Sequence, residues 1–131
     1  MRFLEQFPVV LPDTSIWIDH LRAPVAVLSM QLERLGVAVH PYVRGELSLG
    51  TIKGRREVLS TLRELPAPYV ARQDEVELMI ESRKLAGSGI GYVDAHLIAS
   101  ALLDRRRTVR VWSKDKRLHK QAEALGVAFE P

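Results

Sequence analysis

The sequence predicts a three-layer α/β/α domain built around a central, mainly parallel β-sheet. Short apolar runs of strand length alternate along the chain with longer segments whose apolar residues recur at helical spacing. Strands separated by helices need right-handed crossovers, which make the strands parallel and place helices on both faces of the sheet. One segment, residues 93–103, is apolar on nearly every side, as expected of a helix buried at the centre of the fold.

The first half of the chain begins with a strand expected at residues 9–11. Pro12 should end this strand, because proline has no amide hydrogen to donate to a central ladder. A helix follows, with Gly36 as its C-terminal cap, and residues 37–39 then form a second strand. The inward face of that helix consists of Val25, Leu28, Leu32 and Leu35.

The second half contains five further elements before the end of the chain. The next helix should stop before Pro66, and another should cover about residues 74–85. A glycine-rich loop at residues 87–91 leads into the buried helix, which is followed by a strand at Val109–Trp112. A last helix ends at a Gly126 cap. The apolar faces of the three amphipathic helices consist of Val58, Leu59, Leu62 and Leu65, then Val76, Met79 and Ile80, then Leu118, Ala122 and Leu125.

Length and composition favour one soluble domain spanning residues 1–131. Apolar residues make up 47% of the 131 and charged residues 27%, and no linker or repeat interrupts them. No apolar run approaches the roughly 20 residues that a membrane helix needs, and a signal-peptide pattern is missing. We therefore expect a cytoplasmic protein.

The absence of cysteine restricts the metal chemistry that is open to the chain. Disulfides and thiolate metal sites are excluded, so any metal must be held by oxygen or imidazole, which favours hard cations such as Mg²⁺ or Mn²⁺. The net charge of +3, from 19 basic and 16 acidic residues, points only weakly to nucleic acid.

Four acidic residues occur at successive element ends. Asp13 directly follows the first strand and Asp115 closely follows Val109–Trp112, at the carboxyl ends where α/β sheets bind ligands. Asp94 begins the buried helix, and Glu46 lies one turn into the helix after the second strand. Singly, each has an ordinary structural explanation: Asp13 and Asp94 as helix N-caps, Asp115 as a turn residue, Glu46 as a solvated helix residue. Together they favour one shared site.

A cluster of four carboxylates needs a counter-charge. Like charges a few ångströms apart raise one another's pKa, so the four cannot all stay ionised on their own. A divalent cation removes this conflict, and the chain has no cysteine and no paired histidines to suggest another kind of metal site. The residues therefore predict an oxygen-liganded metal site.

Four segments resemble the signature segments of PIN-domain nucleases, and most closely those of VapC-type toxins from bacterial and archaeal toxin–antitoxin pairs. They are residues 11–19, 45–47, 94–99 and 113–115, in the family's order over nearly the whole chain. The resemblance implies a PIN-like fold and hydrolysis of RNA phosphodiester bonds with Mg²⁺ or Mn²⁺.

The resemblance also assigns roles residue by residue. It implies that the catalytic and metal-binding acids are Asp13, Glu46, Asp94 and Asp115. Of these, we expect Asp13 and Asp94 to be direct ligands, and the other two to bind a second ion or act through water. It further implies that hydroxyl groups order the pocket, with Ser113 standing where the family often has Thr; these residues are Thr14, Ser15 and Ser113.

The partners that the resemblance implies are an RNA substrate, a second copy of the chain in a homodimer, and a VapB-type antitoxin whose C-terminal segment covers the acidic pocket. Basic residues beside Asp115 are candidates for binding RNA phosphates, namely Lys114, Lys116 and Arg117. A second candidate cluster is residues 105–107. His96, Trp17 and Trp112 fit packing roles better than catalysis or base stacking.

Three alternatives remain open from the residues alone. A metal-dependent DNA nuclease or a phosphatase could use the same scaffold, although an aspartyl-phosphate phosphatase would have an Asp-x-Asp-x-Thr segment after the first strand. A non-catalytic nucleic-acid-binding module could also keep the fold, but it would have no reason to retain four clustered charges.

Overall fold

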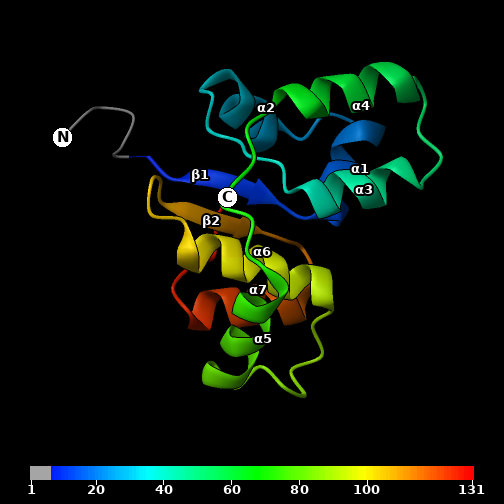
Figure 1. Ribbon diagram of the computed structural model, residues 1–131. Helices are drawn as coiled ribbons and strands as arrows, with labels where there is room; N and C mark the ends of the chain where they lie inside the picture. Colours follow the sequence, from blue (N-terminus) through cyan, green and yellow to red (C-terminus); the bar gives the residue numbers. More distant parts are fainter. Residues whose placement is uncertain (1–6) are drawn as a thin grey trace.

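The computed structural model describes residues 7–131 as a small parallel sheet covered by helices on both faces (Figure 1). Helices α1 to α4 lie on one side of the strands and α5 to α7 on the other, so the three-layer α/β/α prediction is confirmed. The strands are β1 (Val9–Pro12) and β2 (Val109–Trp112). The helices are α1 (Thr14–Arg22), α2 (Ala26–Glu33), α3 (Pro41–Ser48), α4 (Arg55–Glu64), α5 (Gln73–Ser82), α6 (Tyr92–Leu103) and α7 (Lys116–Ala124). Within residues 7–131, no helix has both the length and the apolar character needed to cross a membrane.

The sheet is parallel throughout the described residues. β1 and β2 pair in register, with Val9 opposite Val109 and Pro12 opposite Trp112. Single bridges add one neighbour on each side, Val37 next to β1 and Ala128 next to β2. The spatial order is therefore Val37, β1, β2, Ala128.

The prediction of a full strand at residues 37–39 was wrong, and Pro12 gives the physical reason. The Val10 amide donates to the Gly36 carbonyl at 2.7 Å, and the Ala38 amide donates to the Val10 carbonyl at 2.9 Å. The next donor on this edge of β1 would be the nitrogen of Pro12, which carries no hydrogen. The ladder stops there. The Val39 amide, which faces the opposite edge, donates to the carbonyl of Pro66 at 2.9 Å. Pro12 itself remains the last residue of β1 instead of lying beyond it.

The cap predicted at Gly36 was also wrong. α2 ends at Glu33, and the residue that adopts left-handed backbone angles is Leu35, with φ at 59°. Leu35 therefore does not belong to the inward face, and 79% of its surface is exposed. The cap predicted at Gly126 is confirmed, with φ at 74° just after α7, and α4 ends before Pro66 as expected.

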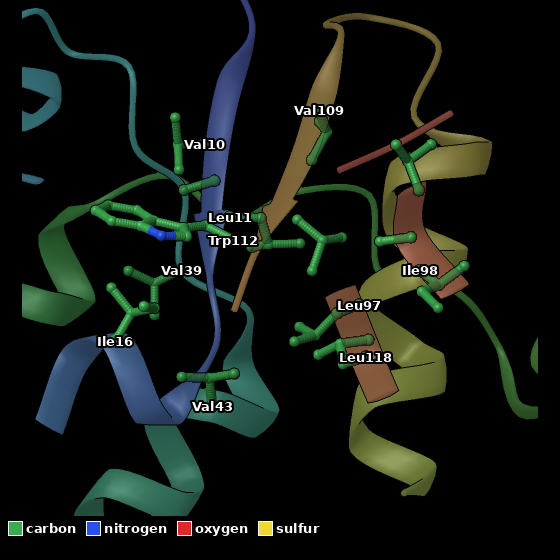
Figure 2. Close-up of a cluster of buried hydrophobic side chains, with 14 of the residues drawn as sticks. Val10, Leu11, Ile16, Val39, Val43, Leu97, Ile98, Val109, Trp112 and Leu118 are labelled. Atoms are coloured by element: carbon green, nitrogen blue, oxygen red, sulfur yellow. The ribbon is translucent and has the colours of Figure 1, made fainter. Parts of the chain in front are cut away.

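The core lies between the sheet and its two helical layers. Residues 95–100 of α6 are all buried, which confirms the prediction of a central helix. In Figure 2, Leu97 and Ile98 of this helix and Leu118 of α7 lie on one side of the strands, with Ile16 and Val43 on the other. Each fully buried aliphatic side chain of this kind contributes about 1.5–3 kcal/mol to burial free energy. Trp17 and Trp112 are 3% and 6% exposed, in agreement with packing roles.

Candidate active site

The acids meet at the carboxyl ends of the two strands. From β1 the chain passes to Val37 on one side of the sheet, and later returns to β2 on the other side. The strand order therefore reverses between β1 and β2, and open α/β sheets bind ligands beyond the strand ends at this switch point. Asp13 directly follows β1, and Ser113 and Asp115 follow β2.

Asp13 is held by three hydrogen-bond donors and is only 6% exposed. Its Oδ1 accepts from the hydroxyl of Ser15 at 2.6 Å and from the amide of Ile16 at 3.1 Å, so it is the N-cap of α1. Its Oδ2 accepts from the hydroxyl of Ser113. A carboxylate offers about four lone-pair positions. One position on Oδ2 therefore remains for a further ligand.

Ser113 joins Asp13 to the loop that carries Asp115. While its hydroxyl donates to Asp13, its oxygen accepts from the Asp115 amide at 2.9 Å. Asp115 is more than a turn residue, since its Oδ1 caps α7 by accepting from the amides of Arg117 at 2.9 Å and Leu118 at 3.3 Å. This single oxygen makes both capping bonds, so Oδ2 takes no part in the cap.

Glu46 reaches the site from α3. The hydroxyl of Thr14, at the start of α1, donates to Glu46 Oε1 at 2.6 Å. The bond joins two helices across 32 residues of sequence and fixes an otherwise exposed carboxylate. All three hydroxyl residues singled out in the sequence thus donate to an acid of the proposed set.

Asp94 lies in the first turn of α6 and is partly buried. It is not the N-cap, which is Gly91; its Oδ2 accepts from the Gly91 amide at 3.1 Å, as the acid of a capping box does. Burial raises the pKa of the Asp94 carboxyl, and the negative charges of Asp13, Asp115 and Glu46 raise it further against the opposing Gly91 hydrogen bond. Asp94 therefore lies close enough to the other three acids to be repelled by their charges.

In the described part of the chain, no basic side chain forms an ion pair with these four acids. Among residues 7–131, no Lys, Arg or His nitrogen lies within 4.0 Å of the four carboxylates. Lys114 pairs instead with Asp19 at 2.7 Å, and Arg117 extends over Gly89, whose carbonyl accepts from its Nη1 at 3.5 Å. Lys116 is exposed beside them.

The donor set suits a hard divalent cation, with water completing its shell. Carboxylate oxygens are the ligands that Mg²⁺ and Mn²⁺ prefer, and Mg²⁺ usually retains several waters. In the described part of the chain, ligand atoms of three groups converge within 4.8 Å only at His119, Glu123 and Glu130 near the end of α7. The four acids are more widely spread than that trio, which fits coordination partly through water.

The histidine at position 40 has a structural role that the sequence did not reveal. His40 is buried, and its Nδ1 accepts from the Tyr42 amide at 3.0 Å, capping α3 directly before Pro41 at the first helical position. Its ring centroid lies 5.7 Å from that of His96, which is 1% exposed and packs on Tyr42 and Tyr92. The packing role expected of His96 is confirmed. The only sequence signal for His40 was its place before a proline that begins a helix.

Comparison with known proteins gives two close matches. No family model matches the chain. Two curated proteins called Ribonuclease VapC32, from the CDC 1551 / Oshkosh and ATCC 25618 / H37Rv strains of Mycobacterium tuberculosis, are each 42% identical to it over 121 residues. The alignment covers 92% of this chain and 96% of each relative.

Proposed function

The chain belongs to the VapC family of PIN-domain ribonucleases, and from this premise we propose that it hydrolyses RNA at Asp13, Glu46, Asp94 and Asp115 with the help of a divalent metal ion. One observation carries the choice of site: four carboxylates share the switch point of the sheet, and no basic side chain in residues 7–131 pairs with them. Such a group needs an external cation, and hydrolysis of a polyanion is chemistry that a cation at this position can support.

Asp13 and Asp94 are the proposed direct metal ligands. Asp13 has one lone-pair position on Oδ2 left after three hydrogen bonds, and the partly buried Asp94 is the carboxylate that the other three repel. Glu46 and Asp115 are more exposed and would act through water or on a second ion. A bound Mg²⁺ or Mn²⁺ supplies charge stabilisation at the phosphate and lowers the pKa of bound water.

The chain's own residues preorganise the site. Ser15 and Ser113 orient the Asp13 carboxylate from opposite sides, and the Thr14 hydroxyl holds Glu46 toward α1. These bonds fix acidic groups before substrate binds, so little reorganisation is needed at the moment of reaction. Lys114, Lys116 and Arg117, on the loop and first turn next to Asp115, are proposed to bind RNA phosphates flanking the cleaved bond.

The test is cleavage of a defined RNA oligonucleotide and its DNA counterpart, with Mg²⁺, with Mn²⁺ and with EDTA. Asp94→Asn keeps an oxygen for the Gly91 amide but loses the charge, so RNA cleavage should fall at least about 100-fold. Asp74→Asn, on the exposed start of α5, is the matched control and should cleave normally. Undiminished cleavage by Asp94→Asn contradicts the assigned site. Cleavage of DNA alone supports the DNA-nuclease alternative, and no cleavage of either supports a binding module.

The proposed biological role is that of a cytoplasmic toxin held inactive by a VapB-type antitoxin. The two relatives carry the VapC name, and a VapC toxin implies such a partner. The product of the neighbouring reading frame should copurify with the chain and inhibit its cleavage of RNA. Free protein should sediment at twice the 14.8 kDa chain mass if it forms the proposed homodimer. A neighbouring product that neither binds nor inhibits would contradict the toxin role.

A further inference from the structure

A cluster of arginines lies at the end of the sheet opposite to the acids. The loop from α6 to β2 carries three consecutive arginines and β2 a fourth, and together they line a hollow of about 600 Å³. This arginine hollow consists of Arg105, Arg106, Arg107 and Arg110. In Figure 1 the loop lies at the start of β2. Asp13 and Asp115, in contrast, follow the carboxyl ends of β1 and β2. α6 also separates the two, since Asp94 is in its first turn and the loop follows its 12 residues, a length of about 18 Å.

The backbone of this loop is held in place by one aspartate. Asp104 Oδ1 accepts from the amides of Arg106 at 3.0 Å and Arg107 at 3.2 Å, and its Oδ2 accepts from the Tyr69 amide at 2.9 Å. The Ser100 hydroxyl in turn donates to the Tyr69 carbonyl at 2.5 Å. Both oxygens of Asp104, the one acid among the described lining residues, thus accept from backbone amides. The backbone of the loop that carries the arginines is therefore anchored.

Among residues 7–131, no carboxylate forms an ion pair with the arginines of the hollow. In the part of the chain that the structure describes, no carboxylate lies within 4.0 Å of any of its four guanidinium groups. Phe7 also lines the hollow, and the guanidinium of Arg34 lies 5.5 Å from the centre of its ring, which adds a fifth arginine. Among the described residues, five arginines with Asp104 as the single acid have a larger positive net charge than the +3 of the whole chain. This concentration of positive charge favours the binding of a polyanion.

We propose that the arginine hollow binds the phosphate backbone of the RNA substrate at a distance from the cleaved bond, a role that rests on the proposed ribonuclease function. Guanidinium groups bind phosphate oxygens in pairs with fixed geometry, and phosphate contacts position a nucleic acid without reading its sequence. Among the described residues, the apolar part of the lining consists of Phe7, Ala101 and Val109 alone, which suits a phosphate chain better than a protein surface with an apolar centre. An RNA that contacts both ends of the sheet gains affinity from the hollow and has its cleaved bond placed at the acids.

The test is RNA binding as a function of salt, measured in EDTA so that no cleavage occurs. Arg105→Gln with Arg106→Gln removes two charges from the hollow, and Arg56→Gln with Arg83→Gln removes two exposed arginines elsewhere. For a single-stranded RNA of 20 nucleotides, the slope of log K against log salt should become shallower by about 1.4 in the first variant, because each lost phosphate contact is worth about 0.7. The control variant should keep the wild-type slope. Arg105→Lys with Arg106→Lys should keep most of it, and it guards against a folding defect.

A second measurement separates this proposal from the ribonuclease assignment. With Mg²⁺, a trinucleotide has only two internucleotide steps and does not span about 18 Å, so wild type and hollow variant should cleave it equally. The longer RNA should be cleaved less efficiently by the hollow variant, through a higher KM. Equal slopes in all variants, or equal losses in the hollow and control variants, overturn the proposal while trinucleotide cleavage still supports the ribonuclease. A wild type that binds RNA with the expected slope but never cleaves refutes the enzyme and leaves the hollow standing.

Discussion

Asp13 offers the sharpest separation of a structural role from a catalytic one, because it is both the N-cap of α1 and a proposed metal ligand. Asp13→Ala removes the acceptor for the Ile16 amide, which costs about 1 kcal/mol of stability, with a range of roughly 0.5–2. It also leaves the buried Ser113 hydroxyl without its acceptor, at about 1–3 kcal/mol. The half-exposed Ser15 can turn to water. The free energy of unfolding should therefore fall by about 2–4 kcal/mol.

Asp13→Asn should behave differently. The carboxamide oxygen can still accept from Ile16 and Ser15, and the amide nitrogen can donate to Ser113, whose hydroxyl then accepts in place of donating. The Ser113 O–H still loses its acceptor, but the new hydrogen bond from the amide nitrogen offsets part of that cost, so the free energy of unfolding should fall by only about 1 kcal/mol, less than in Asp13→Ala. The negative charge is lost, so RNA cleavage should fall at least about 100-fold, which corresponds to about 2.7 kcal/mol of transition-state stabilisation.

Two assays decide the matter: urea unfolding of both variants at pH 7.5, and the rate of RNA cleavage with Mg²⁺ in excess. The expected pattern is a stable but inactive Asn variant beside a destabilised, inactive Ala variant. If Asp13→Asn cleaves RNA within a few-fold of wild type, the carboxylate is a cap alone. If instead it unfolds as readily as Asp13→Ala, the hydrogen-bond geometry described for this site is wrong.

Two further predictions concern Thr14 and His40. Thr14→Val removes the donor to Glu46 but keeps the shape, so cleavage should fall about 10-fold with less than about 1 kcal/mol lost in stability; an unchanged rate would show that this bond does not position Glu46 for catalysis. Burial, followed by the nearby charge of His96, lowers the pKa of His40 from 6.5 to about 4. As pH falls below 6.5, His40 takes up a proton in the unfolded chain, whereas in the folded chain it stays neutral until about pH 4. The free energy of unfolding measured in urea should therefore fall by about 2 kcal/mol between pH 7.5 and 5. His40→Asn, which can keep the α3 cap, should flatten that dependence, and an equally steep profile would refute the assignment.

The layers of the fold could be predicted from sequence because their signals are local. The all-round apolar pattern of α6 and the apolar run of β2 each identify an element without knowledge of its neighbours. The strand prediction for residues 37–39 was wrong because it depends on a neighbour that is distant in sequence. Its pairing depends on whether Pro12 stands on the edge of β1 that faces it, and only the three-dimensional order of the strands reveals that edge. The prediction that Leu35 lies on the inward helix face was also wrong, because α2 ends two residues earlier than the apolar periodicity indicates.

The residues of the candidate site also differ in how far local sequence signals could place them. Asp13 and Asp115 could be placed by a rule about strand ends, because each follows a strand that the sequence predicts. Glu46 and Asp94 come from helices, and periodicity does not say where a helix end lies relative to the sheet. Their inclusion rested on their places at successive element ends together with the resemblance to a family. Besides burial, the charges of the other three acids raise the pKa of Asp94, which is the structural sign that they lie near it. The hydrogen bond between Ser113 and Asp13 joins residues 100 apart in sequence, which no local pattern reveals.

The structural and functional explanations of these acids are also physically connected. Asp13 caps α1, Asp115 caps α7, and Asp94 lies in the first turn of α6, so three helix N-termini surround the site. Each N-terminus carries a partial charge of roughly +0.5, which together offsets about 1.5 of the four negative charges at most. The helix N-termini therefore reduce the repulsion among the carboxylates without neutralising their charge. Glu46 lies near the C-terminal end of α3 and is not stabilised by a helix N-terminus. The remaining charge, about −2.5, is close to what one divalent cation balances. By this reasoning the capping geometry gathers the carboxylates, and the negative charge that remains would retain the proposed metal ion.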